Sequence, residues 1–273
     1  MDYVELEINF KEVNPWRDIA VSELSDWGFE SFVETKTGLL SYIPVEIFNE
    51  EIKAKVNDLT GVSGFDFKNI PDENWNSKWE ENFDPVYVED KLAIVAPFHK
   101  SYETRPMVIE IQPQMSFGTG HHQTTWLISK RLFGLDLDGK SVLDMGTGTG
   151  VLAILAEKLG ATDVDAPDID IWSYENAKEN AARNSCEYVK VFHGGHELIN
   201  KSYDLVIANI NKNVLIENFS VYSNALESGG KLLLSGFFTT DESDLIKVAE
   251  NFGFNFEQSL NKDEWSMLEF NKK

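Results

Sequence analysis

The chain has 273 residues, of which 42% are apolar and 12% aromatic, so its composition excludes an intrinsically disordered protein and allows one large or two modest domains. A formal net charge of −22 repels phosphate backbones, and we therefore expect no direct binding to nucleic acid. The single cysteine, Cys186, excludes an intrachain disulfide.

The beginning of the sequence shows no apolar signal segment, and no apolar run approaches the length of a membrane span. We therefore expect a soluble, cytoplasmic protein without a membrane partner, and we expect a monomer. The excess of 46 acidic over 24 basic residues would attract a basic protein or a lysine-rich peptide. The same excess is also compatible with solubility alone.

A small α+β domain is predicted over residues 1–70. Apolar residues alternate with a period of two over Tyr3–Phe10 and recur at helical spacing over Arg17–Trp27. The remaining predicted elements are two strands around a Thr37-Gly38 turn, a helix over 49–59 and an aromatic strand at 65–67. The order strand–helix–strand–strand–helix–strand is typical of the ferredoxin-like fold.

Residues 71–90 are predicted to form a linker, in which Trp75 and Trp79 lie on one face of a helix. Such a pair more often packs against the protein than recognises a ligand. Strands over 86–97 and 107–111 then lead into a larger domain, which is predicted over residues 91–273.

From Lys140 onward the pattern alternates strand and helix, which predicts a mainly parallel sheet with helices on both faces. The predicted strands are 141–145, 164–168, 189–193, 203–209 and 231–237, followed by a closing hairpin of 254–260 with 265–270. The predicted fold class is therefore α/β, a doubly wound, Rossmann-like sheet, which binds ligands beyond the carboxyl ends of its strands.

A glycine-rich turn at 146–150 lies between a buried strand and an apolar helix. Its glycines let a ligand approach the backbone closely, and the helix start offers free N–H groups. The spacing is G-x-G-x-G rather than the dinucleotide pattern G-x-G-x-x-G, and Asp144 at the entrance would repel a pyrophosphate. A ligand with an amino group or a positive charge is favoured; the alternative is a glycine turn in an unrelated α/β domain.

Asp168 ends the next predicted strand, 18 residues after Gly150 (168 − 150), close to the spacing of about 20 for an acid that binds ribose hydroxyls. Pro167 cannot donate to a sheet ladder, so we expect it to shorten or distort the strand just before Asp168. The nearby acids do not make a calcium loop, because the twelfth position counted from Asp163 is Tyr174.

Asn209 follows a buried strand and should face the ligand site at the sheet edge. Its amide can accept a hydrogen bond from a substrate amine, and the alternative is an ordinary turn asparagine. A further loop at 115–125, rich in small residues and threonines, could hold a carboxylate. Within it, His121 and His122 diverge and have no partner at ligand spacing, so we expect no metal site.

Four segments occur in the order seen in the PrmA family, the methyltransferases of large-subunit ribosomal protein eleven. They are Phe117-Gly-Thr-Gly-His-His-Gln-Thr-Thr125, Asp144-Met-Gly-Thr-Gly-Thr-Gly150, Pro167-Asp-Ile-Asp170 and Ala208-Asn-Ile-Asn211. The family more often has Pro at position 123 and a short apolar residue at position 167. The chain thus resembles a class I S-adenosylmethionine-dependent methyltransferase over nearly its whole length.

The resemblance implies that residues 1–70 recognise the substrate and that residues 91–273 bind S-adenosylmethionine. It implies methylation of lysine ε-amines and of the N-terminal α-amine of the ribosomal protein, up to the trimethylated state. Asn209 would be the catalytic residue next to the methyl group. The implied cofactor-binding residues are Phe117, Thr119, Gly120, His121, Thr124, Thr125, Asp144, Gly146, Gly148, Asp168 and Asn209.

Because the sulfonium is an activated leaving group, we expect no dedicated general base, only polar groups that align a neutral amine. Three alternatives remain open: a methyltransferase of another protein, one of a small-molecule amine, and a ribosomal-protein-binding module without catalysis. A glutamine methyltransferase of release factors is disfavoured, because Asn209-Ile-Asn-Lys212 stands where that class has Asn-Pro-Pro-Tyr.

Overall fold

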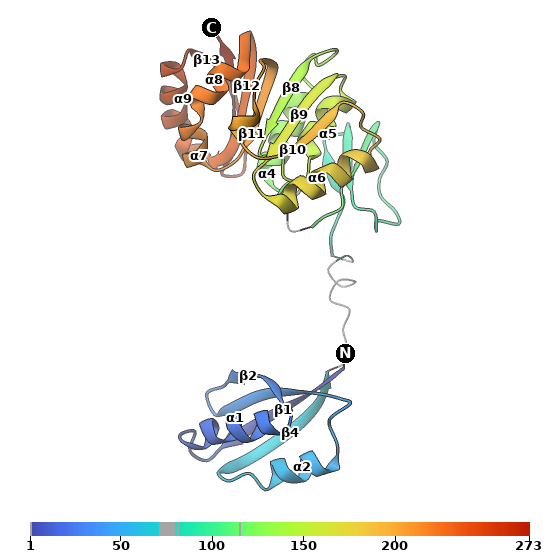
Figure 1. Cartoon of the computed structure of the whole chain (residues 1–273), viewed down its shortest axis with the longest axis vertical. Helices are drawn as coiled ribbons and strands as arrows, with labels where there is room; N and C mark the ends of the chain where they lie inside the picture. The colour runs from blue at the N-terminus through green and yellow to red at the C-terminus, as the bar shows by residue number, and fades with distance from the viewer. Residues whose placement is uncertain (1, 71–79, 81, 115) are drawn as a thin grey trace. The chain divides into compact units, whose positions relative to one another are not determined.

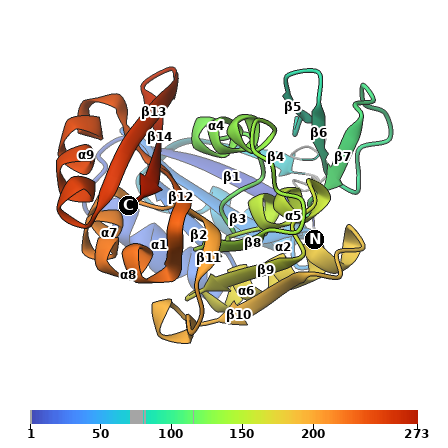
Figure 2. The same ribbon diagram turned by 90° about the horizontal axis from the view of Figure 1, so that it is seen from above.

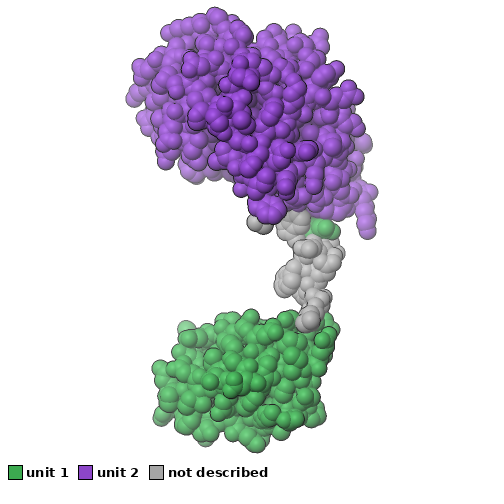
Figure 3. All heavy atoms as spheres, viewed as in Figure 1, with its two compact units in different colours: residues 1–82 green, residues 83–273 purple. Residues whose placement is uncertain are grey.

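The computed structural model describes residues 2–70, 80, 82–114 and 116–273, and the chain divides into two compact units, residues 1–82 and 83–273 (Figure 3). The predicted helix with Trp75 and Trp79 lies outside the described residues. No helix within the described ranges combines the length and apolarity that crossing a membrane requires.

The smaller unit is a four-stranded sheet with two helices (Figure 1). Its elements are β1 (Tyr3–Phe10), α1 (Trp16–Asp26), β2 (Glu30–Glu34), β3 (Gly38–Pro44), α2 (Glu50–Asn57) and β4 (Val62–Ile70). The sheet order is β2-β3-β1-β4, and all neighbouring strands are antiparallel. This is the ferredoxin-like arrangement predicted from the sequence.

Both helices of this unit pack on one face of its sheet. Along β1, Leu6 and Ile8 are fully buried, whereas Glu7 between them is exposed, as a period of two requires. Leu24 of α1 and Val56 of α2 share one core with these strand residues. The other face of the sheet therefore carries the polar residues of the alternating pattern.

The larger unit is built on a seven-stranded sheet. The strands of the unit are β5 (Val86–Val88), β6 (Leu92–Val95), β7 (Met107–Glu110), β8 (Ser141–Met145), β9 (Asp163–Asp168), β10 (Val189–His193), β11 (Tyr203–Asn209), β12 (Leu226–Phe238), β13 (Phe254–Lys262) and β14 (Trp265–Lys272). The helices are α4 (Gln123–Leu132), α5 (Val151–Lys158), α6 (Ile171–Arg183), α7 (Lys212–Glu217), α8 (Phe219–Ala225) and α9 (Glu242–Asn251), with short 3-10 turns at His196–Leu198 and Thr239–Asp241.

The order of the large sheet is β10-β9-β8-β11-β12-β14-β13, and β5, β6 and β7 form a separate small sheet. In this sheet the neighbouring strands β10, β9, β8, β11 and β12 are parallel to one another. β14 pairs antiparallel with both β12 and β13. Helices cover both faces (Figure 2). Ile207 of β11 packs with α4 and α5, and its neighbour Val206 packs with α7, α8 and α9. The predicted doubly wound α/β fold is therefore confirmed.

The expectation that Pro167 shortens its strand is wrong. β9 continues to Asp168 and pairs with β10 along its carboxyl half. On the other side the ladder with β8 ends at Asp165, and Pro167 O accepts instead from Gly146 N at 3.0 Å. Because the N–H and C=O of one strand residue point to the same side, the missing N–H of Pro167 faces the glycine turn, where β8 has already ended.

Candidate cofactor and acceptor site

The turn between β8 and α5, which we call the glycine loop (residues 146–150), has a left-handed backbone. Gly146, Gly148 and Gly150 have φ values of 72°, 57° and 82°, which glycine adopts without strain. At Gly148 a Cβ atom would also collide with the carbonyl oxygen of Phe117. Glycine at this position therefore permits two loops to touch.

Asp144 lies beneath the glycine loop and is 1% exposed. Its Oδ2 atom accepts hydrogen bonds from Thr147 Oγ1 at 2.6 Å and from Ala153 N at 3.2 Å. Burial raises the pKa of Asp144 to about 6, and these two hydrogen bonds oppose the rise. The carboxyl group thus supports the loop and the start of α5 from behind.

Asp168 ends β9 beside the glycine loop. Its Oδ2 atom accepts from Gly148 N at 2.9 Å, and its Oδ1 atom accepts from Asp170 N at 3.0 Å. These bonds fix the orientation of the carboxylate. Because a carboxylate oxygen can accept more than one hydrogen bond, both atoms retain capacity for hydroxyl groups of a ligand.

The loop after β7, residues 116–122, is attached to the glycine loop through Thr149. The backbone N of Thr149 donates to Phe117 O at 2.9 Å, and its Oγ1 atom donates to Gly118 O at 2.6 Å. The two loops that the sequence singled out separately are therefore joined into one structure.

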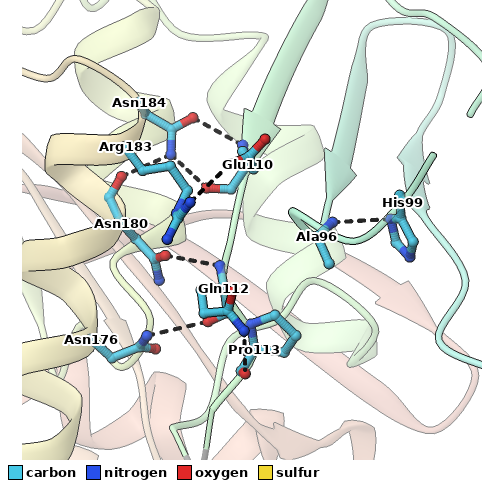
Figure 4. A network of polar contacts seen from close by, with 9 residues as sticks. All are labelled: Ala96, His99, Glu110, Gln112, Pro113, Asn176, Asn180, Arg183 and Asn184. Carbon is cyan, nitrogen blue, oxygen red and sulfur yellow. Dashed lines mark hydrogen bonds and ion pairs between the residues drawn. The ribbon is translucent and has the colours of Figure 1, made fainter. Parts of the chain in front are cut away.

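Asn180 of α6 and Asn184, which caps the carboxyl end of this helix, hold the end of β7 and the chain that follows it (Figure 4). Asn184 accepts from Glu110 N at 2.9 Å and donates to Glu110 O at 2.7 Å, as a neighbouring strand would. Asn180 accepts from Gln112 N at 2.9 Å and donates to Thr149 O at 2.9 Å. Through Asn180 the helix positions both the incoming chain and the glycine loop.

α4 begins at Gln123, within the loop predicted at 115–125, and His122 caps it. The Nδ1 atom of His122 accepts from Thr124 N at 3.3 Å, so the capping ring is neutral and carries its proton on Nε2. Burial lowers the pKa of His122 and favours the same neutral state.

Asn209 lies at the carboxyl end of β11, where the sequence placed it. Its Nδ2 atom donates to Thr125 Oγ1 at 3.3 Å. Its Oδ1 atom is buried and has no hydrogen-bond partner among the residues that the structure describes. Leaving a buried acceptor unpaired costs about 1–3 kcal/mol, so this oxygen is suited to a donor that arrives with a ligand.

A cavity of ≈ 590 Å³ opens at this edge of the sheet, within the range of about 300–1,000 Å³ typical of small-molecule sites. Among the described residues, no group of three or more His, Cys, Asp or Glu side chains is placed to hold a metal ion. The predicted cofactor-binding residues that line the cavity are Phe117, Thr124, Gly146, Gly148, Asp168 and Asn209.

The five other predicted residues do not line this cavity. Thr125 and Asp144 act through the neighbours described above. Thr119 and His121 line a separate hollow on the 116–122 loop, and Gly120 packs against β6. Direct contact of these five residues with a cofactor remains a prediction.

Several residues of the cavity wall are not among those predicted from the sequence. Ile169, 79% exposed, and the Gly194-Gly195 pair follow strand ends, which is the signal that found Asp168 and would have found them too. Trp265 also lines the cavity although it begins a strand. Because β14 runs antiparallel to its neighbour, its first residue lies at the carboxyl edge of the parallel strands, which only the sheet order reveals.

Known proteins with similar sequences carry the same name as the matching family model. The family model described as ribosomal protein L11 methyltransferase (PrmA) matches residues 15–273. A ribosomal protein L11 methyltransferase of Porphyromonas gingivalis is 44% identical over 260 residues, which cover 93% of this chain and 90% of that protein. One of Phocaeicola vulgatus is 39% identical over 279 residues, which cover 99% of each chain.

Solved structures agree with the sequence relatives. A ribosomal protein L11 methylase from Lactobacillus delbrueckii subsp. bulgaricus superimposes with a TM-score of 0.66 at 27% identity and covers 70% of this chain and 100% of that one. A methyltransferase from Pyrococcus furiosus shares the fold, with a TM-score of 0.52 at 20% identity over 60% of this chain and 89% of that one. The chain therefore belongs to the ribosomal protein L11 methyltransferase family, and its larger unit has the class I methyltransferase fold.

Proposed function

We propose that this protein transfers methyl groups from S-adenosylmethionine to ribosomal protein L11, at lysine ε-amines and at the N-terminal α-amine. Family membership supports the reaction class, and the relatives carry this substrate in their names. The observation that carries the proposal is Asn209, which lines the cavity and whose buried Oδ1 atom has no hydrogen-bond partner among the described residues. A neutral carbonyl oxygen accepts a hydrogen bond from an amine without becoming a competing nucleophile.

The cavity suits S-adenosylmethionine, which supplies a methyl group on a positively charged sulfur. Asp168 has remaining acceptor capacity for ribose hydroxyls, in agreement with its spacing from the glycine loop. Ile169 offers an exposed apolar side chain beside it for the face of a base. None of the described residues that line the cavity is lysine or arginine, so no such cation opposes a cationic ligand there.

Proton removal is left to water. The titratable side chains of the described wall are Asp168, His122 and His196. Asp168 is engaged by two backbone N–H groups, and the Nδ1 atom of His122 is engaged by the α4 cap. His196 is exposed to solvent and exchanges protons with water. We infer that a lysine ammonium, with an ordinary pKa of about 10.4, loses its proton to water as the cavity desolvates it. Asn209 then orients the neutral nitrogen for attack.

We assign recognition of the protein substrate to residues 1–70 and methyl transfer to residues 91–273. Residues 71–90 are assigned as the linker between these two domains. The net charge of −22 favours a basic protein as partner. The sheet face that the helices leave open carries Glu5 and Glu7, which pair across the sheet with Lys68 and Asp66, so acidic groups outnumber basic ones in these pairs. This face is accordingly suited to basic segments.

Cofactor binding and methyl transfer separate the proposal from its alternatives. Calorimetric titration with S-adenosylmethionine should show binding, and Asp168→Ala should weaken it by about 10- to 100-fold, since hydrogen bonds to a charged group are lost. Purified ribosomal protein L11 should take up label from methyl-labelled cofactor. Binding without transfer to this protein would indicate another acceptor amine. Absence of cofactor binding would indicate a non-catalytic binding module.

A further inference from the structure

Four aromatic rings meet where the larger unit begins. Phe83, the first residue of this unit, is half-buried, and the ring centroid of His121 lies 4.4 Å from its own. The rings of Phe98 and His99 lie 5.8 and 6.0 Å from that of Phe83 and 5.0 Å from each other. We refer to these four described residues as the aromatic joint, and none of them lines the cofactor cavity.

The two histidines of the joint hold consecutive backbone carbonyl groups. The Nε2 atom of His99 donates to Phe83 O. The Nε2 atom of His121 donates to Asp84 O at 2.8 Å. Because a carbonyl oxygen only accepts, each ring carries a proton on Nε2. The backbone at 83–84 is therefore held at two successive residues by side chains from two other parts of the chain.

These histidines belong to different parts of the larger unit. His99 follows β6, and its Nδ1 atom accepts from Ala96 N at 3.0 Å (Figure 4), so this ring is anchored to the small sheet. His121 belongs to the 116–122 loop, which is attached to the glycine loop and contributes His122 to the cavity wall. His121 therefore connects the aromatic joint to the cofactor cavity.

The aromatic joint also marks the boundary between the two units. The smaller unit ends at Asn82, so the chain passes from one unit to the other at Phe83. A side chain that holds the backbone at Phe83 and Asp84 consequently acts on the point at which the substrate-recognition unit is attached.

We propose that His121 is a positioning residue that couples the cofactor cavity to this attachment point. The inference rests on the proposed function, which supplies the two ligands, S-adenosylmethionine and the basic protein substrate. When the cofactor orders the 116–122 loop, His121 holds the backbone at 83–84 and restricts the recognition unit at its point of attachment. Part of the ordering that the protein substrate requires has then already taken place, so this substrate binds more tightly.

Such coupling is reciprocal. If the cofactor raises the affinity for the protein substrate, the protein substrate raises the affinity for the cofactor by the same factor, which is about 5- to 150-fold for coupled sites in general. A joint that only stabilised the fold would contribute equally with and without cofactor. Measurements made in both states therefore distinguish the two roles.

Hydrogen exchange of the whole chain tests the coupling without the protein substrate. With saturating S-adenosylhomocysteine, confirmed by calorimetry, exchange in segment 83–88 should slow by at least about 5-fold. His121→Asn should abolish this slowing, because its shorter amide does not reach Asp84 O. His121→Gln should retain part of it, since its Nε2 atom replaces that of the ring. His121 is exposed, so both variants should fold.

Kinetics with ribosomal protein L11 tests the consequence for the substrate. Phe83→Ala removes the central ring of the joint and leaves the cavity wall unchanged. At saturating cofactor it should raise KM for ribosomal protein L11 by at least about 5-fold and change kcat by less than about twofold. Lys158→Ala is the matched control, because it removes an exposed donor to another backbone carbonyl, Asn184 O, outside the joint. The control should change neither KM nor exchange at 83–88.

Three results would overturn the proposal. The first is equal exchange at 83–88 with and without S-adenosylhomocysteine in the unmodified protein. The second is slowing that survives in both His121→Asn and Phe83→Ala, and the third is an unchanged KM for ribosomal protein L11 in Phe83→Ala. Slowing that depends on His121, without any methylation of ribosomal protein L11, would support the aromatic joint and count against the proposed function.

Discussion

The side-chain amide of Asn209 donates to Thr125 Oγ1 at 3.3 Å, and its own oxygen is buried without a partner in the cavity wall. Thr125 is fully buried on α4, and its hydroxyl accepts from the amide nitrogen, so the amide oxygen is left as an unused acceptor. An unused acceptor on a residue that lines the cavity matches an amine substrate.

Asn209→Ala should lower kcat for methyl transfer by about 10- to 100-fold, since it removes a hydrogen bond that aligns the nitrogen. The affinity for S-adenosylmethionine should stay within about twofold, because the other predicted cofactor-binding residues of the cavity, Asp168 and Gly148 among them, are left in place. Thr125→Val should give a smaller loss, because it only releases the amide. Asn255→Ala, at an exposed position of β13, is the control. Methylation rates that are unchanged in Asn209→Ala would remove this residue from the mechanism.

Gly148→Ala should abolish cofactor binding, because the new methyl group would collide with Phe117 O and separate the two loops. Gly229→Ala is a matched control, since Gly229 also has a positive φ of 80° but nothing within 4 Å of the added atom. The control should lose only about 1–2 kcal/mol of stability from backbone strain and should bind cofactor normally. Calorimetry together with thermal unfolding measures both effects. Equal cofactor affinity in the two variants would contradict the close approach of the loops.

Asn180→Ala should reduce both stability and cofactor affinity. It leaves Gln112 N and Thr149 O without partners, at a cost of about 1–3 kcal/mol for each group. Asn184→Ala removes the equivalent contacts one turn away, which do not reach the glycine loop. Denaturant unfolding should show destabilisation of both variants, whereas calorimetry should show weaker S-adenosylmethionine binding only for Asn180→Ala. Similar cofactor affinities would mean that α6 does not position the loop.

Asp144→Asn should change how stability depends on pH. The pKa of Asp144 is raised from 3.8 to about 6, so the folded state retains this proton longer than the unfolded state as pH rises. The free energy of unfolding of the unmodified protein should therefore fall by up to about 3 kcal/mol as pH rises from about 4 through 6. The variant lacks this titration, so its free energy of unfolding should rise relative to that of the unmodified protein over the same range. A difference between the two that is independent of pH would show that Asp144 titrates normally.

Much of the fold could be predicted because the central strands are buried on both faces. The runs at 141–145 and 203–209 are apolar and bounded by polar or glycine residues, and both strands end where predicted. Asp168 and Asn209 were located by the rule that ligands bind beyond strand ends.

The roles of other residues depend on features that a linear pattern does not contain. Asp144 lies two residues after Val142, so both side chains point to the same face of the sheet, the face that packs with α5. The carboxylate of Asp144 therefore points toward Ala153 N rather than into the cavity. Trp265 reaches the cavity only because β14 is antiparallel. The strand containing Pro167 stays intact because its missing N–H faces a loop.

The most direct measurement of the central claim is the intact mass of purified ribosomal protein L11 after incubation with enzyme and S-adenosylmethionine. We predict mass increases in whole multiples of one methylene unit, confined to lysine and N-terminal amines, that accumulate much more slowly with Asn209→Ala. An unchanged mass with folded enzyme that binds the cofactor would contradict the assigned substrate. An equal rate with Asn209→Ala would contradict the assigned site.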